Sequence, residues 1–172
     1  MSSTPSSLNW RLLAAIVALS MAGLALVMWS TQPARPLVDA KLDFTLKDLD
    51  GRDVRLSDLK GRPLVINFWE TFCVPCQYET PELVSLHEKY KDRGVTFVGI
   101  SMHDEVPAIR AFVEKYHVAH TILVGGERDD IANAFGLVGY PTTVFVRADG
   151  TVANVQLGYV PGEAEKRILA LF

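Results

Sequence analysis

A short, mainly apolar run at residues 64–69 ends just before a pair of cysteines, and this junction limits the possible folds more than any other feature of the sequence. The run, Leu-Val-Ile-Asn-Phe-Trp, follows Gly61-Arg62-Pro63 and contains no charged residue. Its length and apolar content are typical of a strand buried on both faces of a sheet. We therefore predict a central strand that leads the chain directly to Cys73 and Cys76.

A helix and a second strand are predicted after the cysteines. Side chains suited to one buried helix face recur at helical spacing, at Leu83, Leu86, His87 and Tyr90. Gly94 is suited to end this helix before a strand at residues 95–100. Strand, helix and strand together form a β-α-β unit, which indicates an α/β sheet.

The remaining segments extend this unit into a larger sheet. Further helices are predicted near residues 105–116, 129–135 and 162–171, and further strands near residues 121–124, 142–146 and 152–157. Asp149-Gly150 would join the last two strands as an antiparallel hairpin, and Asp50-Gly51 would join residues 44–46 to 54–56. The predicted fold class is therefore α/β, with an N-terminal hairpin and a mixed sheet flanked by helices.

The N-terminal part of the chain has a different composition. Residues 12–28 form an uncharged, almost wholly apolar run of 17 residues between Trp10 and Trp29. Tryptophan favours membrane interfaces, and this length is at the low end of what crosses ~30 Å of hydrocarbon. We expect a short tail at 1–11, a transmembrane anchor at 12–29, a linker at 30–40 and a globular domain at 41–172.

Two alternatives to a retained anchor stay open. A cleaved signal peptide could use Ser20-Met21-Ala22 as its small-residue cleavage site, and a buried soluble helix is the third possibility. Anchor and signal peptide both export the domain. The predicted location is therefore the bacterial inner membrane, with a single-pass anchor and the domain on the periplasmic side.

The charge balance argues against nucleic acid as a partner. From Asp39 onward the chain carries 20 acidic and 15 basic residues, a net charge of −5 (15 − 20). No basic stripe interrupts this balance.

Cys73 and Cys76 are the only cysteines of the chain, and they lie at the predicted start of a helix. A thiolate there faces free N–H groups and the positive end of the helix dipole, which can lower its pKa from about 8.5 toward roughly 3.5–7.5. Pro75 is tolerated in a first helical turn and constrains the loop between the sulfurs. The pattern predicts thiol–disulfide exchange, with Cys73 as the nucleophile and Cys76 as the resolving thiol.

A structural disulfide and half of a metal site are the alternatives for the same pair. A bridge across so short a loop removes little entropy from the unfolded chain, and a tetrahedral zinc ion needs two further ligands. His117 and His120 have a tolerable spacing for such ligands, whereas His87 and His103 are weaker candidates. We expect no bound metal.

The passage from Asn67 to Cys76, together with Gly139-Tyr140-Pro141-Thr142-Thr143, resembles the TlpA/ResA/CcmG group of thioredoxin-like proteins. The resemblance extends from about Lys41 to Phe172 and includes a helix–strand insertion near residues 103–124. It implies a thioredoxin-like fold behind one N-terminal transmembrane helix.

The same resemblance implies roles for residues around the cysteine pair. It implies a cis bond before Pro141, which faces the cysteines, and a Tyr140 backbone that binds an incoming substrate strand. Trp69, Phe72 and Thr142 are expected to line the same substrate site, although packing is the simplest role for Trp69. Phe72 stands where the family usually has a tryptophan, so it keeps an aromatic wall without an indole donor.

Three polar residues in or near this motif bear on its chemistry. The resemblance assigns the active-site carboxylate to Glu79, three residues after Cys76, with a role in proton handling. Asn67 stands where thioredoxins carry a buried aspartate, and because an amide cannot titrate, we expect Glu79 to replace it. Glu70 replaces a small residue; it would raise the pKa of Cys73 or select basic substrates, or else face solvent without a role.

These features predict a thiol–disulfide oxidoreductase whose only redox group is the Cys73–Cys76 pair. The resemblance implies a reductase for cytochrome c maturation or oxidase copper-site assembly, with apocytochrome c or copper-site proteins as substrates and a membrane thiol donor as its source of electrons. A copper-binding or copper-delivery module on the same fold is the alternative, although such relatives typically space their cysteines C-x-x-x-C. A redox-inactive docking domain is the third possibility.

Overall fold

The computed structural model describes residues 10, 13–18, 20–21 and 42–172. The chain divides into two units, Met1–Pro36 and Leu37–Phe172. Residues 13–18 of the first unit are helical, and no helix among the described residues is both long and apolar enough to span a membrane. The predicted linker, most of the predicted tail and much of the predicted anchor lie outside the described residues.

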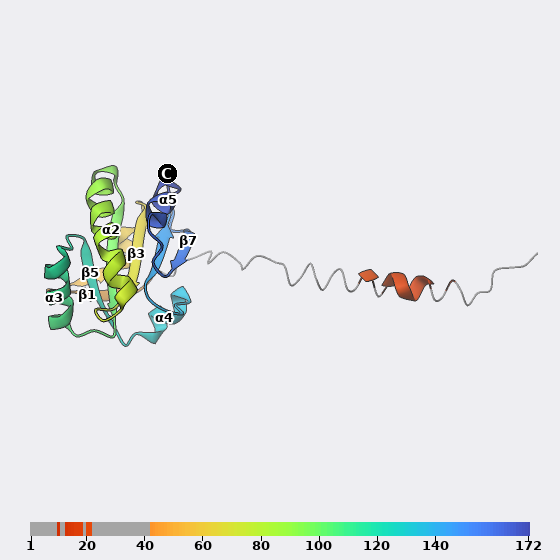
Figure 1. Cartoon of the computed structure of the whole chain (residues 1–172), viewed down its shortest axis with the longest axis horizontal. Coiled ribbons are helices and arrows are strands. Elements are labelled where there is room, and N and C mark those ends of the chain that lie inside the picture. The colour runs from red at the N-terminus through yellow and green to blue at the C-terminus, as the bar shows by residue number, and fades with distance from the viewer. Residues whose placement is uncertain (1–9, 11–12, 19, 22–41) are drawn as a thin grey trace, which may run out of the picture. The chain divides into compact units, whose positions relative to one another are not determined.

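One mixed, seven-stranded sheet forms the centre of the second unit (Figure 1). Its strands are β1 (Thr45–Asp48), β2 (Asp53–Arg55), β3 (Leu64–Trp69), β4 (Thr96–Met102), β5 (Thr121–Gly126), β6 (Thr142–Val146) and β7 (Val152–Leu157). They lie in the order β2-β1-β5-β4-β3-β6-β7. β3, β4 and β5 run parallel, whereas β6 is antiparallel to β3 and to β7. The predicted mixed sheet is therefore confirmed.

The N-terminal hairpin is part of this sheet. β1 pairs antiparallel with β2, as the turn signal at Asp50-Gly51 predicts, and β1 also pairs antiparallel with β5. Asp48 stabilises the turn because its carboxylate accepts hydrogen bonds from the backbone N–H groups of Asp50 and Arg52, both at 2.9 Å. The hairpin thus covers the edge of β5 and continues the sheet by two strands.

The described part of this unit has four α-helices and two short 3-10 helices. They are α2 (Val74–Tyr90), α3 (Val106–Tyr116), α4 (Asp129–Phe135), α5 (Glu163–Leu169), η1 (Leu56–Leu59) and η2 (Lys91–Arg93). All lie between strands except α5, which follows the last strand. The helices and strands predicted within residues 41–172 are confirmed, and where bounds were predicted they differ by two residues at most. Gly94, at a φ of +84°, turns the chain from η2 toward β4, as predicted.

Side chains of β3 alternate between two core layers. Ile66 and Phe68 belong to a cluster that also includes side chains of α4, whereas Val65 belongs to a cluster with α2 and α5. Trp69 joins a third cluster with Cys76 of α2 and side chains of α3. Figure 1 shows α2 crossing the sheet in front of β3. Because the strand alternates with a period of two, Asn67 points to the same face as Val65 and Trp69, toward α2.

The packing of β3 predicts a large difference between two nearby phenylalanines. Phe68 is 0% exposed and its ring centroid lies 4.9 Å from that of Phe135, whereas Phe72 is 68% exposed. Phe68→Ala is expected to lower the free energy of unfolding by roughly 3–5 kcal/mol because it leaves a core cavity. Phe72→Ala is expected to change it by about 0.5 kcal/mol or less. Chemical denaturation measures both values, and equal losses would contradict this account of the core.

Candidate redox-active site

Cys73 and Cys76 lie at the N-terminus of α2 and form a disulfide, with their Cα atoms 5.2 Å apart. Cys73 is the N-cap residue, and its Sγ accepts a hydrogen bond from the backbone N–H of Cys76 at 3.3 Å. Pro75 occupies the first turn, where a missing N–H leaves no hydrogen bond unmade. The strand-to-helix junction predicted from sequence therefore places the pair at the positive end of a 17-residue helix.

The two cysteines differ in their access to solvent. Cys73 is half-buried, whereas Cys76 is 1% exposed and packs in a core cluster with Trp69 and Ile109. Only Cys73 is therefore open to a substrate disulfide. This asymmetry agrees with the predicted division into an attacking and a resolving thiol.

Glu79 forms a buried hydrogen-bonded group with two residues from the sheet. Its Oε2 accepts a hydrogen bond from Asn67 Nδ2 of β3 at 2.8 Å, and its Oε1 accepts one from Thr143 Oγ1 of β6 at 3.2 Å. Asn67 Nδ2 also donates to Thr143 Oγ1 at 2.9 Å. Glu79 is only 2% exposed and lies one helical turn beyond Cys76. The sheet and α2 thus hold one buried carboxyl group in direct contact with Asn67, the residue that stands in place of the aspartate whose role Glu79 was predicted to take.

The environment of Glu79 favours its protonated form. Burial raises the pKa of Glu79 from its ordinary value of 4.5 to about 7, and the negative charge of Glu82 adds to this rise. Hydrogen bonds from Thr143 and Asn67 favour the charged form and so offset part of this rise in the pKa. A pKa near neutrality lets this carboxyl group accept and return a proton under ordinary conditions.

The Tyr140–Pro141 bond is cis, as the resemblance implies. Because Thr142 of β6 pairs with Phe68 of β3, Pro141 lies at the edge of the sheet where β3 ends and the cysteine loop begins. Tyr140 packs against the cluster that contains Cys76. Burial raises the pKa of the Tyr140 phenol, and the charge of Glu70 raises it further.

The expected substrate-lining residues occupy different environments. Phe72 is exposed beside Cys73 and can meet a partner protein. Trp69 is 3% exposed and packs on Phe112, with ring centroids 4.4 Å apart, in the same core cluster as Cys76. Thr142 is buried and its hydroxyl donates to the Gly139 carbonyl at 2.6 Å, inside the turn that carries Pro141. Contact of these three residues with a substrate stays a prediction.

Glu70 does not face solvent, so one of the alternatives drawn from sequence is wrong. The residue is buried, and its Oε1 lies 2.9 Å from Nδ1 of His103. His103 adopts a φ of +59° at the end of β4, and its ring centroid lies 6.2 Å from that of Tyr140. A carboxylate–imidazole pair therefore lies next to the proline turn, supplied by the ends of two neighbouring parallel strands.

Asp104 is a site residue that sequence reasoning missed. Its carboxylate accepts hydrogen bonds from Thr71 N at 2.8 Å, Thr71 Oγ1 at 2.6 Å and Ser101 Oγ at 2.6 Å. These bonds hold the loop that leads from β3 to Cys73. A signal was present, because Asp104 follows β4 and the carboxyl ends of parallel strands meet at one edge of a sheet.

The histidines do not assemble a metal site with the cysteines. His117 is the exposed C-cap of α3, whereas His120 lies before β5 with its ring centroid 5.5 Å from that of His87. Among residues 10, 13–18, 20–21 and 42–172, no group of three or more His, Cys, Asp or Glu side chains could hold a metal ion.

A thioredoxin-like sheet, a Cys-x-x-Cys pair at a helix N-terminus and a cis-proline at the same edge define the class of thioredoxin-like thiol–disulfide oxidoreductases. The comparisons with known proteins agree with this class. The chain matches the AhpC/TSA family over residues 38–155, and it belongs to this family.

The curated relatives of the chain carry oxidoreductase names. The chain is 32% identical over 127 residues to the thiol-disulfide oxidoreductase ResA of Geobacillus thermodenitrificans, covering 74% of this chain and 72% of that protein. It is 29% identical to ResA of Halalkalibacterium halodurans, covering 68% of this chain and 66% of that protein. The chain thus spans about two thirds of the length of these curated relatives.

Solved structures resemble the domain over nearly their whole length. The structure of MTB DsbF superposes with a TM-score of 0.71 at 36% identity, covering 78% of this chain and 99% of that chain. A secreted Mycobacterium tuberculosis disulfide oxidoreductase, homologous to E. coli DsbE, superposes with a TM-score of 0.67 at 33% identity, covering 76% and 97%. The family and the thioredoxin-like fold implied by the resemblance are therefore confirmed, whereas the transmembrane helix stays a prediction.

The raised pKa of Glu79 predicts a pH-dependent stability. Between pH 4.5 and about 7 the native state keeps a proton on Glu79 that the unfolded chain releases, so this residue makes the fold less stable as pH rises. Above pH 7 the loss in the free energy of unfolding caused by Glu79 stays constant, at up to about 3 kcal/mol. Glu79→Gln is expected to remove it, so its stability relative to wild type should increase between pH 5 and pH 8.

Denaturation at both pH values measures this difference. Glu88→Gln, at an exposed carboxylate of the same helix, is the matched control and should show no comparable gain with pH. A constant difference between Glu79→Gln and wild type across this range would contradict the assignment.

Proposed function

We propose that this chain is an extracytoplasmic thiol–disulfide reductase that reduces disulfides in substrate proteins through Cys73 and Cys76. The observation that carries the proposal is the unequal exposure of Cys73 and Cys76, together with the buried carboxyl group of Glu79 one helical turn beyond Cys76. The oxidoreductase names of its ResA and DsbE-type relatives support disulfide exchange, and the reductive direction rests on the family resemblance. The apolar run at residues 12–28 supports export, with or without a retained anchor.

The reaction follows from the positions of the three side chains. In the reduced enzyme, the Cys73 thiolate attacks a substrate disulfide, whose S–S bond breaks to give a mixed disulfide and a substrate thiolate that takes a proton. Cys76 then passes its proton to Glu79 and attacks Cys73 Sγ, which forms the Cys73–Cys76 bond and releases the second substrate sulfur as a thiolate that takes a proton. Two electrons pass to the substrate, and no metal or organic cofactor is needed.

The surroundings of Cys73 support a protein as the substrate. Phe72, Val74 and Tyr78 are exposed large side chains in or next to the first turns of α2. The Tyr140 backbone, next to the cis-proline, is proposed to pair with an extended segment of the substrate. Within this role we propose apocytochrome c or a copper-site protein as the substrate and a membrane thiol donor as the electron source, on the basis of the family resemblance.

Cys76→Ala is expected to trap the substrate. Without the resolving thiol, the mixed disulfide on Cys73 cannot be released, so a covalent complex should accumulate in cells and be separable by non-reducing electrophoresis. Cys73→Ala/Cys76→Ala is the control and should capture nothing. Absence of any Cys73-dependent adduct would contradict the proposal, and stoichiometric copper on the reduced protein would favour a copper-delivery role.

The direction of transfer is tested by the reduction potential of the pair. A reductase is expected to equilibrate well below about −200 mV, whereas a strong oxidant lies near −120 mV. Equilibration with glutathione or dithiothreitol buffers measures this potential. A value near that of the strong oxidants would overturn the proposed direction.

Glu79→Gln is expected to slow resolution of the mixed disulfide. Because Gln cannot accept the proton of Cys76, the rate should fall by about 10²-fold at neutral pH and lose its inflection near pH 7. Stopped-flow measurement of the reduced enzyme with a disulfide substrate between pH 5 and pH 9 separates this step. An unchanged pH profile would remove Glu79 from the mechanism.

A further inference from the structure

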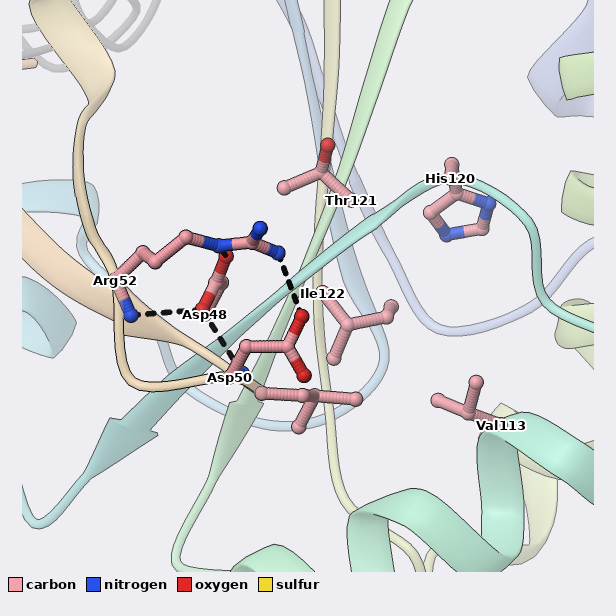
Figure 2. A pocket seen from close by; sticks show the side chains of 8 residues that line it. Asp48, Asp50, Arg52, Val113, His120, Thr121 and Ile122 are labelled. Atoms are coloured by element: carbon pink, nitrogen blue, oxygen red, sulfur yellow. Dashed lines mark hydrogen bonds and ion pairs between the residues drawn. The ribbon is translucent and has the colours of Figure 1, made fainter.

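His120 lines two spaces. The first is a surface pocket of ≈ 220 Å³, where Asp48, Asp50 and Arg52 form an ion cluster and His120 lies on the other side (Figure 2). The second, the inner cavity, has a volume of ≈ 10 Å³ and is lined by both Asn67 and His120. One side chain therefore links the surface with the group that contacts Glu79.

The inner cavity has the size and the polar lining of a site for one water molecule. Its volume is about that of a single water-sized probe, and four of its eight lining residues, Asn67, Trp69, Thr80 and His120, have a nitrogen or oxygen atom in the side chain. A Cβ on Gly99 would lie 2.6 Å from Ile122 Cδ1, 3.1 Å from Trp69 Nε1 and 3.5 Å from His120 Nε2. A side chain at this position would clash with Ile122, so Gly99 lets the Ile122 side chain and both ring nitrogens lie close to β4.

The hydrogen bonds of Asn67 leave one polar atom for this cavity. Both amide hydrogens are donated, one to Glu79 and one to Thr143, so the carboxamide oxygen is the atom with which Asn67 can accept a bond from water. A water there can accept from the Trp69 indole N–H and donate to His120 and to Asn67. When the Asn67 oxygen accepts a hydrogen bond from this water, the Asn67 NH₂ group stays directed at Glu79.

We propose that His120 is a positioning residue which, through one bound water, holds the Asn67 amide in the orientation that donates to Glu79. The proposal rests on the proposed function, in which Glu79 handles the proton of Cys76. With the amide donor fixed, the charged form of Glu79 keeps a hydrogen bond. If the amide rotates, its oxygen faces the carboxylate and the charged form loses this bond.

The charge state of His120 suits this role. Burial, together with repulsion from His87, lowers the pKa of His120 to about 4, so the ring is neutral at pH 7. A neutral ring keeps one nitrogen with a lone pair and one with a hydrogen, which allows it to bond water. The other charged or titratable groups around His120 and Glu79 are His87, Asp48, Asp50, Arg52, Glu82 and Tyr159.

The test is a direct titration of Glu79 in the full chain, purified in its oxidised form, by ¹³C NMR of labelled glutamate carboxyl groups. His120→Leu is expected to raise the pKa of Glu79 by roughly half a unit to one unit, the size of one hydrogen bond. His120→Gln, which can still bond the water, should stay close to wild type. The exposed His117→Asn is the matched control and should also leave this pKa unchanged.

An Asn67→Leu background separates positioning from simple loss of polarity. If His120 acts through Asn67, then His120→Leu should raise the pKa of Glu79 no further in this background. An undiminished rise there, or no rise in the single variant, would overturn the proposal. A crystal structure of the oxidised wild type provides a second measurement, because a dry cavity would also overturn it. Neither measurement needs substrate turnover, so both are independent of the proposed reductase activity.

Discussion

β3 is hydrogen-bonded to a neighbouring strand on each side, and the geometry of the active site depends on this pairing. With β4 on one side and β6 on the other, the register of this strand is fixed, and every side chain has one allowed face. A shift by one residue would turn Asn67 away from α2 and place Phe68 against it. The same pairing fixes where the strand ends, so the cysteine loop, the proline turn before β6 and the end of β4 meet at one edge of the sheet.

Much of this arrangement could be predicted because its signals are local. The apolar run at residues 64–69, the turn pairs Asp50-Gly51 and Asp149-Gly150, and the helical spacing after the cysteines each report a preference of a short segment. The cis bond before Pro141 came from family resemblance instead, because an X-Pro dipeptide does not by itself reveal its isomer. Strand order was not predicted, since the antiparallel contact of β1 with β5 joins segments about 75 residues apart.

The site residues that were missed or misjudged depend on such distant contacts. In the sequence Glu70 is an ordinary charged loop residue, and only the tertiary structure places His103, at the end of β4, beside it. Asp104 likewise has a role only because it binds Thr71 in the loop before Cys73. Thr143 drew attention as part of a motif, yet its bond to Glu79 depends on how β6 lies against α2. The role of a charged or polar side chain depends on its hydrogen-bond or ion-pair partner, and the tertiary structure determines which residue that partner is.

The location of the buried carboxyl group on α2, with only an amide on the strand, has a mechanical consequence. Cys76 and Glu79 are one turn apart on the same helix, whereas Asn67 and Thr143 belong to the sheet. Any displacement of the helix during the redox cycle moves thiol and proton acceptor together as a rigid body, so their separation is kept. What changes instead is the contact of the carboxyl group with the sheet, and with it the balance between its charged and neutral forms. A small rotation of α2 would therefore change the pKa of Glu79 without changing its distance from Cys76.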